Sequence, residues 1–441
     1  MNGGAIPPKS GGMGKPFRIA LAGLGHVGGG VAHILLTHGE ELSHRAGRRL
    51  ELTAVCARDR SKPRRADISR IPWIGDCREL ARTDANAVVE VIGGENGPAL
   101  ALIDAALSAG KPVVTANKAL LATHGARLAA LAEEQNVPLR FEAAAAGGIP
   151  IVKGLRESLI AYGIDSVCGI LNGTCNYILT QMEATGLPFA DVLADAQARG
   201  YAEADPSLDV GGDDTAHKLA ILSALAFGVP PDVKRMRVEG IAHIMPADIA
   251  FAKEFGCRIK LLGIARRTSE GLDQRVQPAM VKLGTPLADV DTVFNAVVAH
   301  AGDAGPFTFE GRGAGEEPTT SAVIADIVDI ARGANGPAFG RPARHLRAMP
   351  VAPPEAHICA FYLRFDARDV PGVLAEIAGH LAYCDVSIES MIQRGRSPGE
   401  PVAIVMITHE CPETAVARAL KVIAASDKVL GPPCMIPMEN G

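Results

Sequence analysis

Carboxylates and a lysine gather in one short stretch of the chain. Residues 200–218 contain Glu203, Asp209, Asp213, Asp214 and Lys218. From Asp213 onward the apolar periodicity is helical, so Asp213 and Asp214 fall in a first turn, where carboxylates are favoured. Asp214 and Lys218 have i, i+4 spacing and share one helix face, which continues through the apolar Leu222. A lysine at the edge of a buried face can move a hydroxyl proton while hydride leaves the carbon. An ordinary helical ion pair worth about 0.3–0.5 kcal/mol is the alternative.

A second lysine follows a predicted strand. Thr115-Ala-Asn117-Lys118 comes at the end of the apolar run Pro112–Thr115. Ligands of parallel α/β sheets bind beyond the carboxyl ends of the strands, so Lys118 is expected at the nicotinamide end of a cofactor. A surface charge is the simpler interpretation of a lysine taken alone.

A glycine fingerprint points to a dinucleotide. Gly23, Gly25 and Gly28 follow a predicted strand, Phe17–Ala22, and open a helical stretch, 29–38. We expect Gly23 to allow the turn, Gly25 to let the backbone approach a pyrophosphate, and Gly28 to let helix and strand pack closely. The helix N-terminus would attract the phosphates.

The end of the second predicted strand, Leu50–Ala57, bears on the choice of cofactor. An acidic residue there is the usual sign of NAD, but this strand runs into Arg58, with Lys62 nearby. Arg58 favours NADP because it could contact a 2′-phosphate. Asp59 leaves NAD open, and Arg58 could also be a solvated loop charge.

The elements around these residues predict three folded parts. Strands alternate with helices over 16–145, which indicates an α/β fold, namely a Rossmann domain with a parallel sheet. An α+β catalytic and dimerisation domain is expected over 146–332. The Pro/Gly-rich segment 333–356 reads as a linker. Residues 357–441 show a βαββα order typical of a ferredoxin-like module. Residues 1–15 read as a flexible leader.

Composition excludes several classes of protein. The net charge is −5, apolar residues make up 48%, and there is no basic block, so we expect no nucleic-acid partner. No apolar run is long enough to span a membrane, and the N-terminus lacks a signal-peptide pattern. The nine cysteines contain no Cys-x-x-Cys pair, so they suggest neither a zinc site nor a redox pair. Reduced thiols favour a cytoplasmic protein.

The motifs together resemble homoserine dehydrogenases. In order and spacing they match that family over about 18–332. They are Gly23–Gly28, Thr115–Lys118, Glu142–Ile151, Asn172–Ile178, Gly200–Lys218 and Gly313–Thr319. The resemblance implies reversible reduction of aspartate 4-semialdehyde to homoserine. No kinase-like segment precedes the Rossmann domain, so an aspartokinase fusion is not expected.

The resemblance also implies roles for single residues. Lys218 would be the acid/base, Lys118 a second essential lysine, Glu203 the ligand of the substrate amino group, and Asp214 a catalytic and substrate-holding residue. The expected cofactor contacts are Gly23, Gly25, Val27, Gly28, Arg58, Thr115, Lys118, Gly200 and Gly315. An alkali cation such as Na⁺ would bind the backbone carbonyls of Glu142, Ala145, Gly147 and Ile149. The family commonly has valine where this chain has Ala145, which a carbonyl ligand should tolerate.

The tail resembles an ACT domain. Asp369-Val370-Pro371-Gly372 is similar to the signature between the first strand and first helix of that class, and 386–393 adds to the match. ACT domains usually pair edge to edge and bind amino acids, so we expect threonine as an effector and a homodimer or homotetramer. A purely structural dimerisation module is the alternative.

Two other functions compete with this interpretation. Another Rossmann semialdehyde or keto-acid dehydrogenase could form an acyl-enzyme on Cys175, although no partner histidine is evident. A non-catalytic amino-acid sensor could combine the tail with an inactive Rossmann domain. The intact set of Lys118, Glu203, Asp214 and Lys218 argues against the sensor.

Overall fold

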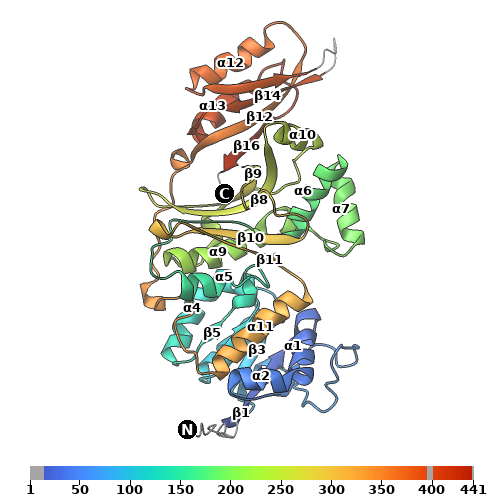
Figure 1. Cartoon of the computed structure of the whole chain (residues 1–441), viewed down its shortest axis with the longest axis vertical. Coiled ribbons are helices and arrows are strands. Elements are labelled where there is room, and N and C mark those ends of the chain that lie inside the picture. The colour runs from blue at the N-terminus through green and yellow to red at the C-terminus, as the bar shows by residue number, and fades with distance from the viewer. Residues whose placement is uncertain (1–13, 395–400, 440–441) are drawn as a thin grey trace, which may run out of the picture. The chain divides into compact units, whose positions relative to one another are not determined.

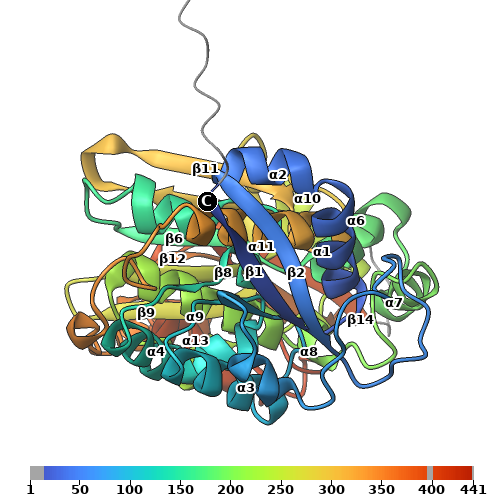
Figure 2. The ribbon, with the colours of Figure 1, turned by 90° about the horizontal axis from the view of Figure 1, so that it is seen from below.

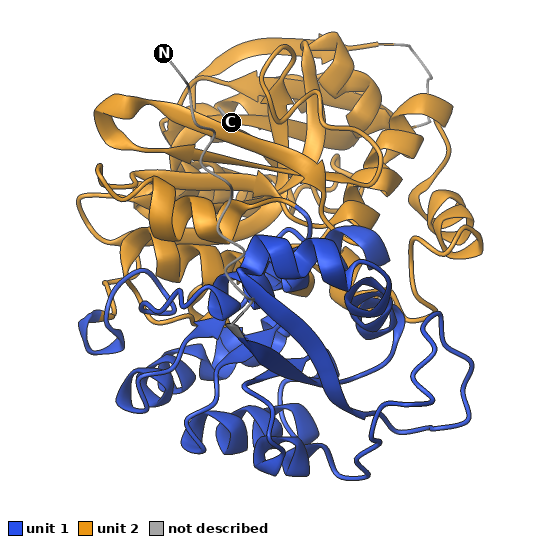
Figure 3. Ribbon diagram, turned by 60° about the horizontal axis from the view of Figure 1, so that its bottom comes forward, with its two compact units in different colours: residues 1–148, 315–345 blue, residues 149–314, 346–441 orange. Residues whose placement is uncertain are grey.

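The chain divides into two compact units, which Figure 3 colours separately. The structure is a computed structural model that describes residues 14–394 and 401–439. Unit 1 comprises residues 1–148 and 315–345, and unit 2 comprises residues 149–314 and 346–441. Most of the predicted leader, residues 1–15, lies outside the described residues.

Unit 1 is a five-stranded parallel sheet with the strand order β2-β1-β3-β4-β5. Figure 2 shows β1 and β2 side by side, with α1 and α11 near them. The strands are β1 Gly14–Ala22, β2 Arg48–Cys56, β3 Ala87–Glu90, β4 Val113–Thr115 and β5 Leu139–Arg140. The helices are α1 His26–Thr37, α2 Gly39–Ala46, α3 Pro98–Ser108, α4 Lys118–Glu134 and α11 Glu316–Ala331. Strands β3 and β4 are short and buried throughout, as expected for a sheet covered on both faces.

Helix α11 completes this unit from far along the chain. Its Val323 and Ile327 belong to the same apolar core as Ile19 and Val31. The contact with α1 is close, because a Cβ on Gly30 would lie 2.4 Å from Thr320 Oγ1. The structure therefore differs from the predicted boundary at 332, since residues 315–331 pack with the Rossmann-type sheet.

Residues 333–356, which the sequence predicted to be a linker, are folded and make specific contacts. Phe339 is fully buried, and its ring centroid lies 5.1 Å from that of Phe141. The Ala343 amide donates to Glu133 at 2.8 Å, which holds residues 333–345 on unit 1. Further along, Val351 makes a parallel bridge to Leu272 within unit 2. A composition rich in Pro and Gly could not predict these contacts, because each depends on one buried side chain or one pair of backbone groups.

Unit 2 is built on an eleven-stranded sheet, and Figure 1 labels its strands β8, β9, β10, β11, β12, β14 and β16. The path through it runs β11-β10-β6-β8-β9-β16-β12-β14-β13, and β7 and β15 pair with β9 and β12. The catalytic part of the unit contributes six strands: β6 Ser166–Ile170, β7 Arg237–Val238, β8 Cys257–Arg267, β9 Leu272–Lys282, β10 Phe294–His300 and β11 Pro306–Arg312. Its helices are α5 Ile151–Lys153, α6 Gly173–Thr185, α7 Phe189–Ala198, α8 Ser207–Val210, α9 Asp213–Phe227 and α10 Pro246–Glu254.

The C-terminal module follows the expected βαββα order, with the two-residue strand β15 inserted before α13 and the strand β16 added at the end. Its elements are β12 Ile358–Arg368, α12 Val373–Tyr383, β13 Ile388–Gln393, β14 Pro401–Thr408, β15 Cys411–Pro412, α13 Glu413–Ile423 and β16 Cys434–Glu439. The two helices contact each other and share an apolar core with β12 and β14. Strand β16 lies between β12 and β9, so the module continues the catalytic sheet without a break.

Two further features concern membrane spans and thiols. Within the described residues, no helix is both long and apolar enough to cross a membrane. All nine cysteines are free, and all except Cys384 are buried.

Candidate active site

In unit 1, a buried carboxylate organises the carboxyl ends of β3 and β4. Glu90 is fully buried, and its Oε1 accepts from the amides of Ile92 (2.7 Å) and Gly93 (3.1 Å). Its Oε2 accepts from Thr115 Oγ1 at 2.5 Å. Thr115 Oγ1 also accepts from the Asn117 amide at 3.0 Å. One carboxylate thus fixes both loops at this edge of the sheet.

Asn117 continues this arrangement and places Lys118. Its side chain caps α4 by accepting from the Leu120 amide at 3.2 Å, and its Nδ2 donates to the Gly94 carbonyl at 2.7 Å. Lys118 is the first residue of α4 and is half-buried. The predicted position of Lys118 beyond the end of a parallel strand is therefore correct.

The glycine loop has the local geometry expected of the fingerprint. Gly23 has φ +94°, and a Cβ there would lie 2.5 Å from the Val91 carbonyl oxygen. A Cβ on Gly28 would lie 2.0 Å from the Gly23 carbonyl oxygen, whereas one on Gly25 would meet nothing within 4 Å. Gly25 is the N-cap of α1 and offers no capping side chain. An open approach to uncapped helix amides suits the phosphates of a dinucleotide.

A basic loop follows β2. Arg58 is exposed, and the Asp59 carboxylate is committed to Ser61, whose amide (2.8 Å) and hydroxyl (2.7 Å) both donate to it. These hydrogen bonds hold the pKa of Asp59 below its usual value. Arg64 stacks on Trp73, with its guanidinium carbon 5.1 Å from the ring centroid.

The same loop lines a cavity of about 520 Å³. Its cationic lining residues are Arg60, Lys62, Arg64 and Arg65. Trp73 forms part of the wall. Sequence reasoning selected Arg58 and noted Lys62 but missed Arg60, Arg64 and Arg65, although the basic run 58–65 is visible in the sequence.

The cluster around Lys218 lies in unit 2 and is buried. Lys218 and Asp214 are each 7% exposed and Asn172 is 4% exposed. Lys218 Nζ donates to Asp214 Oδ2 at 2.7 Å and to the Leu171 carbonyl at 2.6 Å. The predicted pairing of Asp214 and Lys218 on one face of a helix, α9, is confirmed.

Asn172 ties this pair to the end of β6. Its Nδ2 donates to Asp214 Oδ2 at 2.9 Å and to Asp209 Oδ1 at 2.7 Å. Its Oδ1 accepts from the Cys175 amide at 2.8 Å, which caps α6. One side chain therefore fixes the start of α6, the carboxylate of Asp214 and, through that carboxylate, the lysine.

Cys175 is unsuited to be a nucleophile. It is fully buried, and its thiol lies 3.2 Å from the Asp209 carbonyl. Burial, with added repulsion from Asp209 and Asp214, raises its pKa well above the usual value. An acyl-enzyme mechanism needs a thiolate, so this geometry counts against the acyl-enzyme alternative.

The segment before α9 presents Glu203 to solvent. Gly200 has φ +76° and is exposed, and Gln197 Nε2 donates to the Glu203 carbonyl at 3.0 Å. The hydroxyl of Thr174 donates to the Tyr201 carbonyl at 2.7 Å, which joins this segment to α6. Of the remaining predicted residues, Val27 is half-buried on α1, and Gly315, with φ +116°, is the N-cap of α11 in unit 1.

Comparison with known proteins is consistent along the whole chain. Residues 23–142 match the NAD-binding domain model of homoserine dehydrogenase, and residues 150–328 match the homoserine dehydrogenase model. A homoserine dehydrogenase of Neisseria gonorrhoeae is 45% identical over 434 residues, which cover 97% of this chain and 99% of the relative.

Solved structures give the same result. The homoserine dehydrogenase of Thiobacillus denitrificans aligns with a TM-score of 0.89 and 41% identity, over 97% of this chain and 99% of that one. A hyperthermophilic archaeal homoserine dehydrogenase in complex with NADPH aligns with a TM-score of 0.63 and 25% identity, over 73% of this chain and 99% of the other.

Proposed function

Because this chain belongs to the homoserine dehydrogenase family, we propose that it interconverts L-aspartate 4-semialdehyde and L-homoserine with Lys218 as the acid/base group. It is an oxidoreductase with a nicotinamide cofactor, and its reaction is a step of amino-acid biosynthesis. The observation that carries the assignment of Lys218 is the buried cluster of Asn172, Asp214 and Lys218.

Lys218 moves the proton of the substrate hydroxyl. Its ammonium group has three hydrogens, and the bonds to Asp214 and the Leu171 carbonyl use two of them. The third can donate to the carbonyl oxygen of the semialdehyde as that oxygen becomes a hydroxyl. A bound nicotinamide cofactor supplies the hydride. In the opposite direction, the uncharged amine accepts the hydroxyl proton of homoserine.

Three other residues are assigned to the substrate. The exposed carboxylate of Glu203 binds the substrate amino group, Asp214 helps to hold the substrate, and Lys118 is a second essential lysine. Glu90 and Asn117 are positioning residues, because they fix the loop from which Lys118 projects.

Homoserine oxidation tests this assignment directly. The full-length protein is assayed with NAD⁺ and NADP⁺, and the Lys218→Ala variant serves as the inactive reference. Turnover of homoserine supports the proposal. Oxidation of another hydroxy acid in preference to homoserine would favour the general keto-acid dehydrogenase instead, and no turnover of any would favour the amino-acid sensor.

We assign NADP as the preferred cofactor, with NAD as the second choice. The cavity lined by Arg60, Lys62, Arg64 and Arg65 follows β2, where a 2′-phosphate is recognised in Rossmann folds. Asp59 is engaged with Ser61, which weakens the case for a ribose contact.

Arg64→Ala should raise the KM for NADP by about tenfold or more and leave that for NAD within about twofold, since a charge-assisted bond contributes about 1.5–3 kcal/mol. Arg58→Ala is the matched variant. A larger rise in the KM for NADP in Arg58→Ala than in Arg64→Ala would assign the 2′-phosphate contact to Arg58.

An alkali cation is assigned to the carbonyls of Glu142, Ala145, Gly147 and Ile149. Ala146 (φ +55°) and Gly147 (φ +53°) are successive left-handed residues, and such strain is often kept at functional sites. Replacing Na⁺ by a bulky organic cation should lower both the Tm and the activity. Equal Tm values in the two salts would remove this site.

The C-terminal module is assigned as a threonine-responsive ACT domain. Gly372, with φ +89°, is the N-cap of α12 and leaves the helix amides uncapped. Threonine should inhibit the full-length enzyme, and Gly372→Asp should abolish that inhibition by repelling the effector carboxylate. Gly431→Asp is the control, since Gly431 has φ +91° and equally open surroundings. Activity that does not change with threonine concentration would indicate that the module has only a structural role.

We also assign a homodimer or homotetramer. Strand β13 is an edge of the large sheet, and its Met391 is 42% exposed, which suits pairing with a second copy. Sedimentation at several concentrations measures the stoichiometry, and a monomer throughout would refute the assignment.

A further inference from the structure

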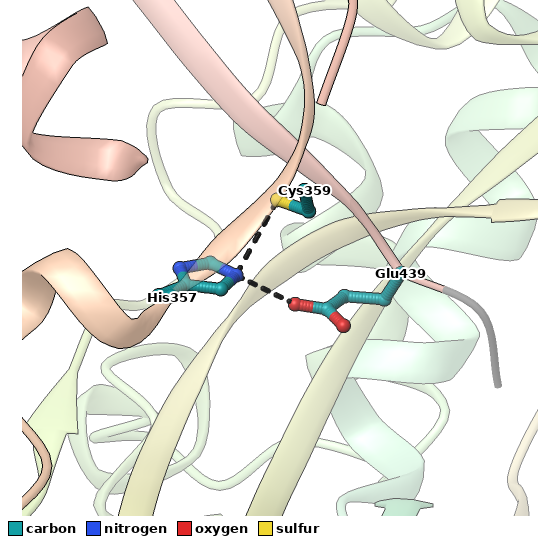
Figure 4. Close-up of side chains that lie close together, drawn as sticks. All are labelled: His357, Cys359 and Glu439. Carbon is teal, nitrogen blue, oxygen red and sulfur yellow. Dashed lines mark hydrogen bonds and ion pairs between the residues drawn. The ribbon is translucent and has the colours of Figure 1, made fainter. Parts of the chain in front are cut away.

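Three potential metal ligands meet where the C-terminal module joins the catalytic sheet. Figure 4 shows that His357, Cys359 and Glu439 point toward one another. His357 Nε2 lies 3.0 Å from Glu439 Oε1 and 3.4 Å from Cys359 Sγ. The three residues are 4%, 8% and 4% exposed. The cluster is remote in sequence from the residues assigned to catalysis.

Strand geometry brings these residues together. His357 immediately precedes β12 and Cys359 is the second residue of that strand, so alternation places their side chains on the same side. Strands β12 and β16 are antiparallel, with Ala360 opposite Met438. Continuing this register by one residue sets Cys359 opposite Glu439.

We propose that His357, Cys359 and Glu439 bind one Zn²⁺ or a closely related divalent transition-metal ion. Imidazole, thiolate and carboxylate are all zinc ligands in proteins. With zinc–ligand bonds of about 2.0–2.3 Å, tetrahedral geometry places such atoms roughly 3.3–3.6 Å apart. The observed separations from Nε2 are close to these values before any ion has drawn the atoms into place. A water molecule, or the thiol of Cys411 opposite Cys359 in β15, would complete the shell.

The hydrogen-bonding pattern leaves a role for a cation. Nε2 of His357 carries at most one hydrogen, yet both Glu439 Oε1 and Cys359 Sγ lie against it. One hydrogen can be directed to only one of these atoms. A metal ion at this point would bind all three groups at once.

The surrounding residues resemble the outer shell of a metal site. Nδ1 of His357 lies 2.7 Å from Glu413 Oε2, an arrangement that orients the ring with Nε2 toward the metal. Arg237 donates to both oxygens of Glu413, at 2.6 and 2.9 Å. Arg275 Nη2 donates to Glu439 Oε1 at 2.6 Å.

Two arginines lie beside Glu439, Arg275 at 2.6 Å and Arg266 at 3.5 Å, and neither opposes the ion. Binding of the ion displaces two protons, one from Nε2 of a doubly protonated His357 and one from the thiol of Cys359. A divalent cation replaces these two positive charges, so the net charge next to Arg275 is unchanged. Arg275 can keep its bond to Glu439 in the same way that hydrogen bonds support other ligating carboxylates.

The ion would act as a structural pin. Its ligands come from the start of β12 and the end of β16, and Arg275 links Glu439 to β9 of the catalytic part. The site has no recognisable sequence motif, because Cys359 has no second cysteine at the spacing of a zinc motif.

Metal content of the untagged full-length protein tests the proposal. Protein loaded with Zn²⁺ and dialysed against a weak chelator is analysed by mass spectrometry for metal per chain. Wild type and the control Cys384→Ser, which removes a cysteine outside the cluster, should retain one ion per chain. Cys359→Ser and Glu439→Gln should lose it, with homoserine oxidation measured as the check on folding.

Two further measurements hold even if a cluster variant fails to fold. Wild type loaded with Co²⁺ should show thiolate-to-cobalt charge transfer in the near ultraviolet and intense visible bands of tetrahedral geometry. Zn²⁺ at about a hundredfold excess over Kd should raise the wild-type Tm by roughly 3 °C. An unloaded wild type, a cobalt spectrum without the thiolate band, or equal loading of folded Cys359→Ser would overturn the proposal and leave His357 in an ion-pair network alone.

Discussion

The amide of Asn172 offers a sharp test of how the acid/base lysine is positioned. Serine at this position can still cap α6, because Ser and Asn are about equally good N-caps. It is too short to reach Asp214 and Asp209, which Asn172 contacts at 2.9 and 2.7 Å. Asn172→Ser therefore separates the capping role from the positioning role.

The expected loss follows from one hydrogen bond. A bond from the amide to an ionised carboxylate contributes about 1.5–3 kcal/mol. If the bond to Asp214 supports Lys218 in the transition state, kcat/KM falls by about 10- to 150-fold at 1.36 kcal/mol per decade. Loss of the Asp209 bond costs less than this, since Asp209 is partly exposed and water can replace the amide.

Steady-state kinetics and thermal unfolding of two variants give the answer. Asn172→Ala also removes the cap, which should cost about 1 kcal/mol more in stability than serine does. Both variants should show the same loss of kcat/KM per folded molecule, with cofactor affinity unchanged. If Asn172→Ser keeps more than half of the wild-type kcat/KM, or if activity falls only in step with stability, the positioning role is refuted.

Three further variants test the rest of the site. Lys218→Ala should lower kcat by about 10²–10⁴-fold with cofactor affinity intact, and retention of more than half the activity would remove Lys218 from the reaction. Glu203→Ala should raise the homoserine KM by about tenfold or more through loss of a charge-assisted contact, whereas an unchanged KM would place Glu203 outside the substrate site. Gly28→Ala should destabilise unit 1 by about 1–3 kcal/mol, because the added methyl group meets the Gly23 carbonyl. Gly29→Ala has open surroundings and should cost nothing, so equal denaturation midpoints for the two would contradict the packing argument.

Local patterns were enough to predict the elements that carry the chemistry. The strand before Gly23, the helix after Gly28 and the helix that bears Asp214 and Lys218 all follow from periodicity and first-turn charge. These features depend on neighbours in sequence, which is the range over which such patterns are informative.

Features that depend on distant neighbours were missed. Residues 315–331 belong with unit 1 because their apolar face meets α1, and nothing in their own sequence names that partner. Strand β16 is short, and its position between β9 and β12 is set by pairing at both edges.

The same limit applies to the site. Asn172 was seen only as part of a family motif, although it links Asp209, Asp214 and the start of α6. Glu90 was overlooked, since a single carboxylate at the end of an apolar strand has no sequence signature. Glu90 accepts two local hydrogen bonds from Ile92 and Gly93, and a third from Thr115 that forms only when β3 and β4 lie side by side.

The two-segment construction of unit 1 affects how the protein is made. On the ribosome the fingerprint loop and α1 emerge early, but α11, which covers α1, is synthesised only after unit 2 has begun. At a translation rate of about 5–20 residues per second, the apolar face of α1 stays uncovered for on the order of ten seconds or more before α11 is made. During that interval the nascent chain exposes the face of α1 around Val27 and Gly30, which Thr320 of α11 contacts in the folded protein, and this makes it a substrate for chaperones that bind apolar helices. Slowing translation before residue 316 should therefore lower the yield of soluble enzyme more than slowing it after residue 345.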